Sequence, residues 1–80
     1  MNYVYVLKNS KQFYIGSTTD LKRRYQEHAE NKVFSTKNRG PWKLVYYEAC
    51  QIEKDARLRE KYLKTAWGKR YLKGRLRYAL

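Results

Sequence analysis

The sequence predicts an α+β domain in which a small, mainly antiparallel sheet of three strands is flanked by two or three helices. Three observations support this fold class. The chain has 80 residues, enough for a single domain spanning 1–80. Hydrophobic residues make up 42% of it, close to the usual share for globular proteins. Short runs of β-branched and aromatic residues are followed by segments of helical periodicity, so both kinds of element are expected.

Three segments have the composition of β-strands. Asn2–Leu7 and Gln12–Ser17 are rich in β-branched and aromatic residues, and a short polar segment, 8–11, separates them. Two such runs joined by a polar turn predict an antiparallel hairpin. Trp42–Cys50 is the third predicted strand, and its density of apolar residues indicates a place at the centre of the sheet.

Two segments are predicted to be helical, and a third has weaker periodicity. Asp20 is a suitable N-cap for a helix that should end near Glu30–Asn31. Ile52–Trp67 carries the longest helical pattern, and Gly68 is predicted to follow its end as the C′ residue. The basic tail, Lys69–Leu80, has apolar residues at roughly helical spacing.

Charge is the strongest compositional signal. Nineteen lysines and arginines against seven aspartates and glutamates give a formal charge of +12. A positive field of this size on a small domain attracts polyanions, so nucleic acid, with DNA first, is the expected partner. A basic ribosome-associated protein and an anionic membrane surface are the alternatives. The residues expected to contact backbone phosphates are Lys22, Arg23, Lys32, Lys37, Arg39, Lys69, Arg70 and Lys73.

Several classes of protein are excluded. No apolar run approaches the roughly 20 residues of a membrane-spanning helix, and the N-terminal run is too short for a signal peptide. The one cysteine, Cys50, cannot form an internal disulfide, which is typical of a cytoplasmic protein. With His28 as the one histidine, the chain alone cannot build a structural zinc site. We therefore expect a cytoplasmic location and no membrane partner; the sequence does not predict an oligomeric state.

Polar residues interrupt the apolar faces of both predicted helices. Arg24 and His28 share a face with Leu21 and Tyr25, and Glu60 lies on the stripe of Ala56, Leu63 and Trp67. A buried lone carboxylate costs several kcal/mol unless a cation meets it. The partner of Glu60 is therefore Arg24, in a structural ion pair, or a metal ion.

The predicted hairpin contributes two tyrosines and a glycine. Tyr5 and Tyr14 lie on facing strands, where aromatic side chains usually belong to the core. Gly16 is more informative, because a glycine inside a strand indicates a bulge or a point where another backbone or a ligand comes close.

These residues carry a resemblance to the GIY-YIG nuclease domain, in its short stand-alone bacterial form. Val4-Tyr5-Val6 stands in place of the first triplet, without its glycine and isoleucine, and Tyr14-Ile15-Gly16 reproduces the second. Residues 16–24 look like the family's entry into its first helix, residues 39–45 like the start of the third strand, and residues 55–60 like the helix with the acidic residue. The resemblance covers nearly the whole chain, although serine follows the second triplet where some members carry a lysine.

The resemblance implies a metal-dependent endonuclease that hydrolyses phosphodiester bonds in DNA. Tyr5 would be the general base or orient the attacking water, and Tyr14 would orient water or relay a proton. Arg24 would clamp the phosphate oxygens, and His28 would hydrogen-bond either Tyr5 or the phosphate. Glu60 would hold one divalent metal ion, Mg²⁺ in the first place, with Mn²⁺ as a substitute.

Two other functions are weighed against the nuclease. A catalytically silent nucleic-acid-binding adaptor predicts salt-dependent binding without cleavage, and a structural partner of the ribosome predicts association with RNA. For the nuclease, stacking of exposed aromatics such as Phe34 on unpaired bases would favour single-stranded or branched DNA. The chain has no room for a targeting domain, so target choice would rest on DNA structure or a partner protein, in repair, recombination or uptake-related processing. The sequence does not decide between DNA and RNA.

Overall fold

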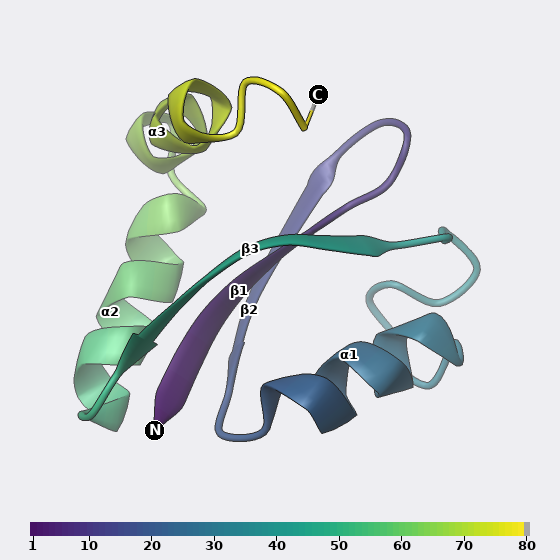
Figure 1. The fold of residues 1–80 in the computed structure, drawn as a ribbon, viewed down its shortest axis with the longest axis horizontal. Coiled ribbons are helices and arrows are strands. Elements are labelled where there is room, and N and C mark those ends of the chain that lie inside the picture. Colours follow the sequence, from purple (N-terminus) through teal and green to yellow (C-terminus); the bar gives the residue numbers. More distant parts are fainter. Residues whose placement is uncertain (80) are drawn as a thin grey trace.

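A computed structural model describes residues 1–79 as a three-stranded sheet with helices on both of its faces, which confirms the predicted fold class (Figure 1). The elements, in chain order, are β1 (Asn2–Lys8), β2 (Phe13–Thr18), α1 (Leu21–Ala29), β3 (Lys43–Cys50), α2 (Glu53–Leu63) and α3 (Ala66–Arg75). Helix α1 packs on one face of the sheet, and α2 and α3 pack on the other. No helix in the described part of the chain is long and apolar enough to cross a membrane.

The strand order is β2–β1–β3, and both neighbouring pairs are antiparallel. The hairpin is confirmed, but the prediction that the third strand lies at the centre is wrong, because β1 is central and β3 is an edge strand. Residues 4–7 of β1 are each at most 1% exposed, since elements cover this strand on both faces. Tyr47 in β3 is 54% exposed. Two of the residues that give the third strand its apolar density, Tyr46 and Tyr47, remain in contact with solvent.

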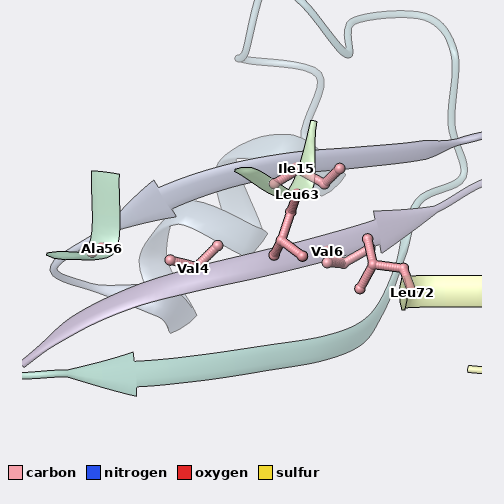
Figure 2. Close-up of a cluster of buried hydrophobic side chains, with 6 residues drawn as sticks. All are labelled: Val4, Val6, Ile15, Ala56, Leu63 and Leu72. Carbon is pink, nitrogen blue, oxygen red and sulfur yellow. The ribbon is translucent and has the colours of Figure 1, made fainter. Parts of the chain in front are cut away.

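The larger core cluster lies between the sheet and helices α2 and α3. Its members are Val4, Val6, Ile15, Ala56, Leu63 and Leu72, and Figure 2 shows these six side chains together over the sheet. Fully burying a side chain of the size of leucine contributes about 1.5–3 kcal/mol to folding. Because Leu63 and Leu72 are completely buried, this cluster fixes both helices on the sheet.

A second core cluster lies on the opposite face, under α1. It is made of Tyr5, Leu7 and Trp42, with Tyr14, Leu21, Tyr25 and Leu44 packed around them. Successive side chains of a strand point to opposite faces, so Tyr5 and Leu7 face this cluster while their β1 neighbours face the larger one. Helix α1 begins as predicted, with Asp20 Oδ1 accepting a hydrogen bond from the Arg23 backbone N–H at 3.1 Å. Tyr5 is therefore held between the sheet and α1.

The segment predicted as one helix, Ile52–Trp67, forms parts of two. The Thr65 hydroxyl accepts a hydrogen bond from the Gly68 backbone N–H at 3.2 Å and so caps a new helix, α3. Gly68 is therefore in the first turn of α3, and its prediction as a C′ residue is wrong. A Cβ atom at residue 68 would collide with the backbone of Leu63, so glycine permits the close packing of α2 and α3. Because the chain turns there, Trp67 is 66% exposed and does not continue the buried stripe of α2.

The basic tail is helical as far as Arg75, and Leu80 lies outside the described residues. Arg59 of α2 ties α3 and β3 together. Its guanidinium donates hydrogen bonds to both carboxylate oxygens of Glu48 at 2.9 and 2.8 Å and lies 4.9 Å from the ring centre of Tyr71. This bidentate ion pair anchors α2 and α3 to the edge strand of the sheet.

Candidate active site beside strand β2

Tyr5 and Gly16 are opposite each other on β1 and β2, and the phenol of Tyr5 lies against Gly16. A Cβ atom at residue 16 would lie 2.5 Å from Tyr5 Oη and 2.7 Å from Tyr5 Cζ, closer than real Cβ atoms come to other atoms. Another group does come close to Gly16, but it is the side chain of Tyr5 and not the backbone or the ligand that the sequence predicts. Since β2 is an edge strand, the missing side chain leaves room for the phenol beside the edge of the sheet.

A chain of hydrogen bonds runs from Tyr5 through His28 to Thr36, and all three residues are at most 1% exposed. Tyr5 Oη lies 2.8 Å from His28 Nε2, and His28 Nδ1 lies 2.7 Å from Thr36 Oγ1. Thr36 Oγ1 in turn donates to the carbonyl of Val33 at 3.5 Å. We therefore assign the ring proton to Nδ1, which leaves Nε2 to accept from the Tyr5 hydroxyl. The sequence left open whether His28 hydrogen-bonds Tyr5 or the phosphate, and in the structure it contacts Tyr5.

Burial sets the protonation state of both Tyr5 and His28. It raises the pKa of Tyr5 to about 12, while the neighbouring Arg24 acts to lower this pKa and Glu60 to raise it. Burial also lowers the pKa of His28 below its ordinary value of 6.5, and the charge of Arg24 acts in the same direction. Near neutral pH, Tyr5 is a neutral phenol and His28 is a neutral imidazole. The pKa effects place Arg24 and Glu60 within electrostatic reach of the Tyr5 hydroxyl.

The lowered pKa of His28 makes folding stability depend on pH. The unfolded chain binds a proton at His28 near pH 6.5, whereas the folded protein does so only at a lower pH, so acid favours unfolding in this window. We expect the free energy of unfolding to fall as the pH drops below about 6.5, measured by urea denaturation at a series of pH values. His28 is the one histidine of the chain. A His28→Gln variant should lose this dependence, and a flat profile for the unmodified protein would contradict the assignment.

Tyr14 is the second phenol of the cluster. Its ring centre lies 5.1 Å from that of His28 and 6.4 Å from that of Tyr5. Its hydroxyl lies 3.3 Å from Ser35 Oγ, in the loop that follows α1. Tyr14 is half-buried whereas Tyr5 is fully buried, so Tyr14 is the more accessible of the two residues.

Arg24 extends from α1 and is partly exposed. Its Nη1 lies 3.0 Å from Glu27 Oε1, and its side chain is 38% exposed. It makes no ion pair with Glu60, which pairs with Lys64, the C-cap residue of α2. The Arg24–Glu60 ion pair weighed from the sequence is therefore wrong. A guanidinium has five N–H donors, so the bond to Glu27 leaves Arg24 able to bind a further anion.

Glu60 is held beside β2 by two contacts. Ser17 Oγ donates a hydrogen bond to Glu60 Oε1 at 2.7 Å, and Lys64 Nζ donates to Oε2 at 2.9 Å. A carboxylate has about four lone-pair positions, so these contacts leave room for a hard cation such as Mg²⁺. No group of three or more His, Cys, Asp or Glu side chains within residues 1–79 is placed to hold a metal ion. Glu60 alone would supply the protein ligand.

The predicted phosphate-binding residues are all exposed, but they do not form one patch. Lys22 and Arg23 lie on α1, Lys32, Lys37 and Arg39 in the loop after it, and Lys69, Arg70 and Lys73 on α3. Helices α1 and α3 lie on opposite faces of the sheet (Figure 1). Phe34, in the loop beside Tyr14 and its partner Ser35, is 93% exposed, as its predicted stacking role requires.

Three residues of this cluster were missed by the sequence reasoning: Ser35, Thr36 and Lys64. Thr36 has no sequence signal, because a threonine in a basic loop is unremarkable until its burial is known. The loop is folded around it, with Trp42 Nε1 donating to the Thr36 carbonyl at 3.1 Å. Lys64 follows Glu60 by four residues, and this spacing on a helix does predict an ion pair.

Three comparisons with known proteins bear on the family and the fold of this chain. A sequence model of the GIY-YIG catalytic domain matches residues 1–73. A UPF0213 protein of Clostridium perfringens is 41% identical over 66 residues, which are 80% of this chain and 71% of that protein. One from Haloquadratum walsbyi is 36% identical over 66 residues, 80% and 74% of the two chains. The solution NMR structure of a UPF0213 protein from Bacillus halodurans superposes with a TM-score of 0.56 at 36% identity, covering 90% of this chain and 82% of that one.

Proposed function

The chain belongs to the GIY-YIG family, and we propose that it is a metal-dependent endonuclease that hydrolyses phosphodiester bonds in DNA. The observation that carries this proposal is the hydrogen-bonded chain Tyr5–His28–Thr36, with Arg24 and Glu60 close enough to act on the pKa of Tyr5. Hydrolysis of a phosphodiester needs a proton acceptor for water, a cation for the phosphate and a ligand for a metal ion. The phenol of Tyr5 and the imidazole of His28 would accept the proton. The guanidinium of Arg24 would bind the phosphate, and the carboxylate of Glu60 would bind the metal ion.

The attacking water must lose a proton as its oxygen bonds to phosphorus, while the bond from phosphorus to the leaving sugar oxygen breaks and that oxygen takes a proton from solvent. We assign Tyr14, the more accessible phenol, to orient this water. Tyr5 Oη takes the proton while its own proton passes to His28 Nε2, 2.8 Å away. Tyr5 is then again a neutral phenol. A pKa of about 12 disfavours a stable phenolate, but it permits this transfer because Tyr5 gains one proton as it loses another. The imidazolium keeps its Nδ1–H bond to Thr36, which holds the ring in place.

Arg24 is assigned to the phosphate. Its planar guanidinium can donate two parallel hydrogen bonds to the non-bridging oxygens, and it is partly exposed while still anchored by Glu27. Negative charge on these oxygens grows in the transition state, where a fixed cation stabilises it.

Glu60 is assigned to the metal ion. Mg²⁺ keeps several waters and is commonly bound by one or two carboxylates together with substrate phosphate, so one protein ligand is sufficient. When bound, the ion would supply Lewis-acid stabilisation of the phosphate. Ser17 fixes the orientation of the carboxylate, and Lys64, whose side chain is 54% exposed, is free to move away from it.

The substrate is assigned to single-stranded or branched DNA. Phe34 is exposed on a loop that is fixed on either side of it by the buried residues Val33 and Thr36. An exposed aromatic ring on the loop that carries Ser35, the partner of Tyr14, is suited to stack on an unpaired base next to the scissile phosphate, which supports this choice. A role in repair, recombination or uptake-related DNA processing would follow from such a substrate.

The test is a cleavage assay on end-labelled single-stranded, duplex and forked DNA, with Mg²⁺, with Mn²⁺ and with EDTA. We expect metal-dependent cleavage, and we expect Glu60→Ala to reduce it about a hundredfold, in the range that loss of an acid–base or metal-binding group produces. Circular dichroism of the variant must show an unchanged fold. Tight binding without cleavage under every condition would favour the adaptor over the enzyme.

A further inference from the structure

We propose that a hollow between the tip of the hairpin and α3 is a second phosphate-binding site, which holds the nucleic-acid strand at a distance from the scissile bond. The inference rests on the proposed function for the identity of the strand. The hollow has a volume of about 400 Å³, and its walls are Lys8, Lys11, Gln12, Phe13, Lys69 and Lys73. We call it the four-lysine hollow.

The lysines of the four-lysine hollow carry positive charge that no carboxylate within residues 1–79 pairs with. None of its lysines forms an ion pair with a carboxylate of residues 1–79, because the acidic side chains are engaged elsewhere. Five glutamates pair with other cations, namely Glu27, Glu30, Glu48, Glu53 and Glu60. Asp20 caps α1, and Asp55 lies in the first turn of α2, at the end away from α3. Lys69 and Lys73 are four residues apart on one helix face, a spacing at which like charges repel. A bound polyanion would relieve this repulsion.

The chemistry of the hollow fits phosphates joined to an organic chain. Each ammonium group is a point charge with three donors, which suits phosphate oxygens approached from several directions. Phe13 adds an apolar surface, since its ring packs on the larger core cluster and remains partly exposed. A sugar or base lying on this ring would have its flanking phosphates within reach of the lysines.

The hollow lies at the start of the strand that leads to the candidate active site. Phe13 opens β2, and Ser17, the partner of Glu60, comes four residues later. Four residues of a strand span about 13 Å, at roughly 3.3 Å per residue. In duplex DNA the successive phosphates of one strand are about 3.4 Å apart along the helix axis, and an extended single strand spaces them more widely, so a few nucleotides would connect the two sites. The same strand could therefore occupy both.

The test measures binding in EDTA, where the proposed nuclease does not cleave, using fluorescence anisotropy of a labelled single-stranded oligonucleotide over a series of salt concentrations. The variant is the double change Lys69→Ala, Lys73→Ala. The matched control is Lys54→Ala, Lys61→Ala, which removes the same charge from exposed positions of α2. We expect the first variant to bind roughly tenfold more weakly, with a salt slope shallower by about 1.4, the value for two lost phosphate contacts on a single strand. The control should keep the slope of the unmodified protein.

Equal weakening of both double variants would show that net charge alone governs binding, and it would overturn the proposal. A titration with inorganic pyrophosphate distinguishes a site for free phosphates from a site for the phosphates of nucleic acid. Its binding is followed by the NMR chemical shifts of the backbone amides that line the hollow. If pyrophosphate shifts these amides while oligonucleotide affinity is the same in all three proteins, the hollow binds free phosphates, and the assignment to nucleic acid is wrong. Lack of cleavage in the presence of metal would contradict the proposed nuclease activity, but it would not change the result of the binding experiment.

Discussion

Replacing Tyr5 by phenylalanine is expected to reduce metal-dependent cleavage about a thousandfold while the protein remains folded. The change removes one hydroxyl group, which is the atom that would take a proton from water and pass another to His28. Loss of such a group typically costs 10²–10⁴ in rate, roughly. The buried His28 Nε2 then lacks a donor, so the free energy of unfolding should fall by about 1–2 kcal/mol, too little to unfold a typical domain. Single-turnover cleavage and urea denaturation measure the two effects.

Tyr25→Phe is the matched control for Tyr5→Phe. It removes a phenolic hydroxyl from α1, the helix that packs on the same face of the sheet as Tyr5. In the unmodified protein, Tyr25 Oη donates to the Trp42 carbonyl at 3.0 Å. Tyr25 is outside the hydrogen-bonded chain of Tyr5, so this variant should cleave at the rate of the unmodified protein. If Tyr5→Phe also cleaves at that rate, Tyr5 is a core residue, and the proposed proton path is wrong.

Local sequence patterns predicted the elements that depend on local chemistry. The hairpin follows from two β-rich runs and a polar turn, and α1 begins at Asp20 because its carboxylate satisfies a free backbone N–H. The same patterns could not rank the strands by burial. A continuous apolar run gives the same pattern in a central strand as in an edge strand in which a residue such as Tyr47 remains exposed. Only the packing of helices on both faces of β1 decides the order.

The candidate site was predicted in its residue types but not in its connections. Spacing on a helix shows that Arg24, His28 and Glu60 interrupt apolar faces, yet it does not show which groups they meet. Arg24 meets Glu27, and Glu60 meets Ser17 from a strand 43 residues away in the chain. The order of motifs in the sequence carries no information about such contacts, because tertiary packing determines them.

Gly16→Ala is expected to damage both stability and the candidate site. The added methyl group would lie 2.5 Å from Tyr5 Oη and 2.7 Å from Tyr5 Cζ, and Tyr5 is 1% exposed, so its ring has little room to retreat. Gly16 has no positive φ angle, so the cost comes from this contact and not from backbone strain. Overpacking of a core typically costs about 1–3 kcal/mol. A displacement of the phenol by about 1 Å would also reduce cleavage about a hundredfold.

A double-mutant cycle attributes the cost of Gly16→Ala to the Tyr5 hydroxyl. In a Tyr5→Phe background the atom at 2.5 Å is gone and the ring carbon at 2.7 Å remains, so the methyl group should destabilise the protein less than it does beside tyrosine. A coupling of about 0.5–3 kcal/mol is typical of residues in contact, and urea denaturation of the four proteins measures it without any assay of activity. Gly74→Ala is the control, because a Cβ atom there meets nothing within 4 Å and alanine favours the helix. Strictly additive losses at Gly16 and Tyr5 would mean that the phenol does not lie against the glycine, and the geometry on which the proton path depends would then be incorrect.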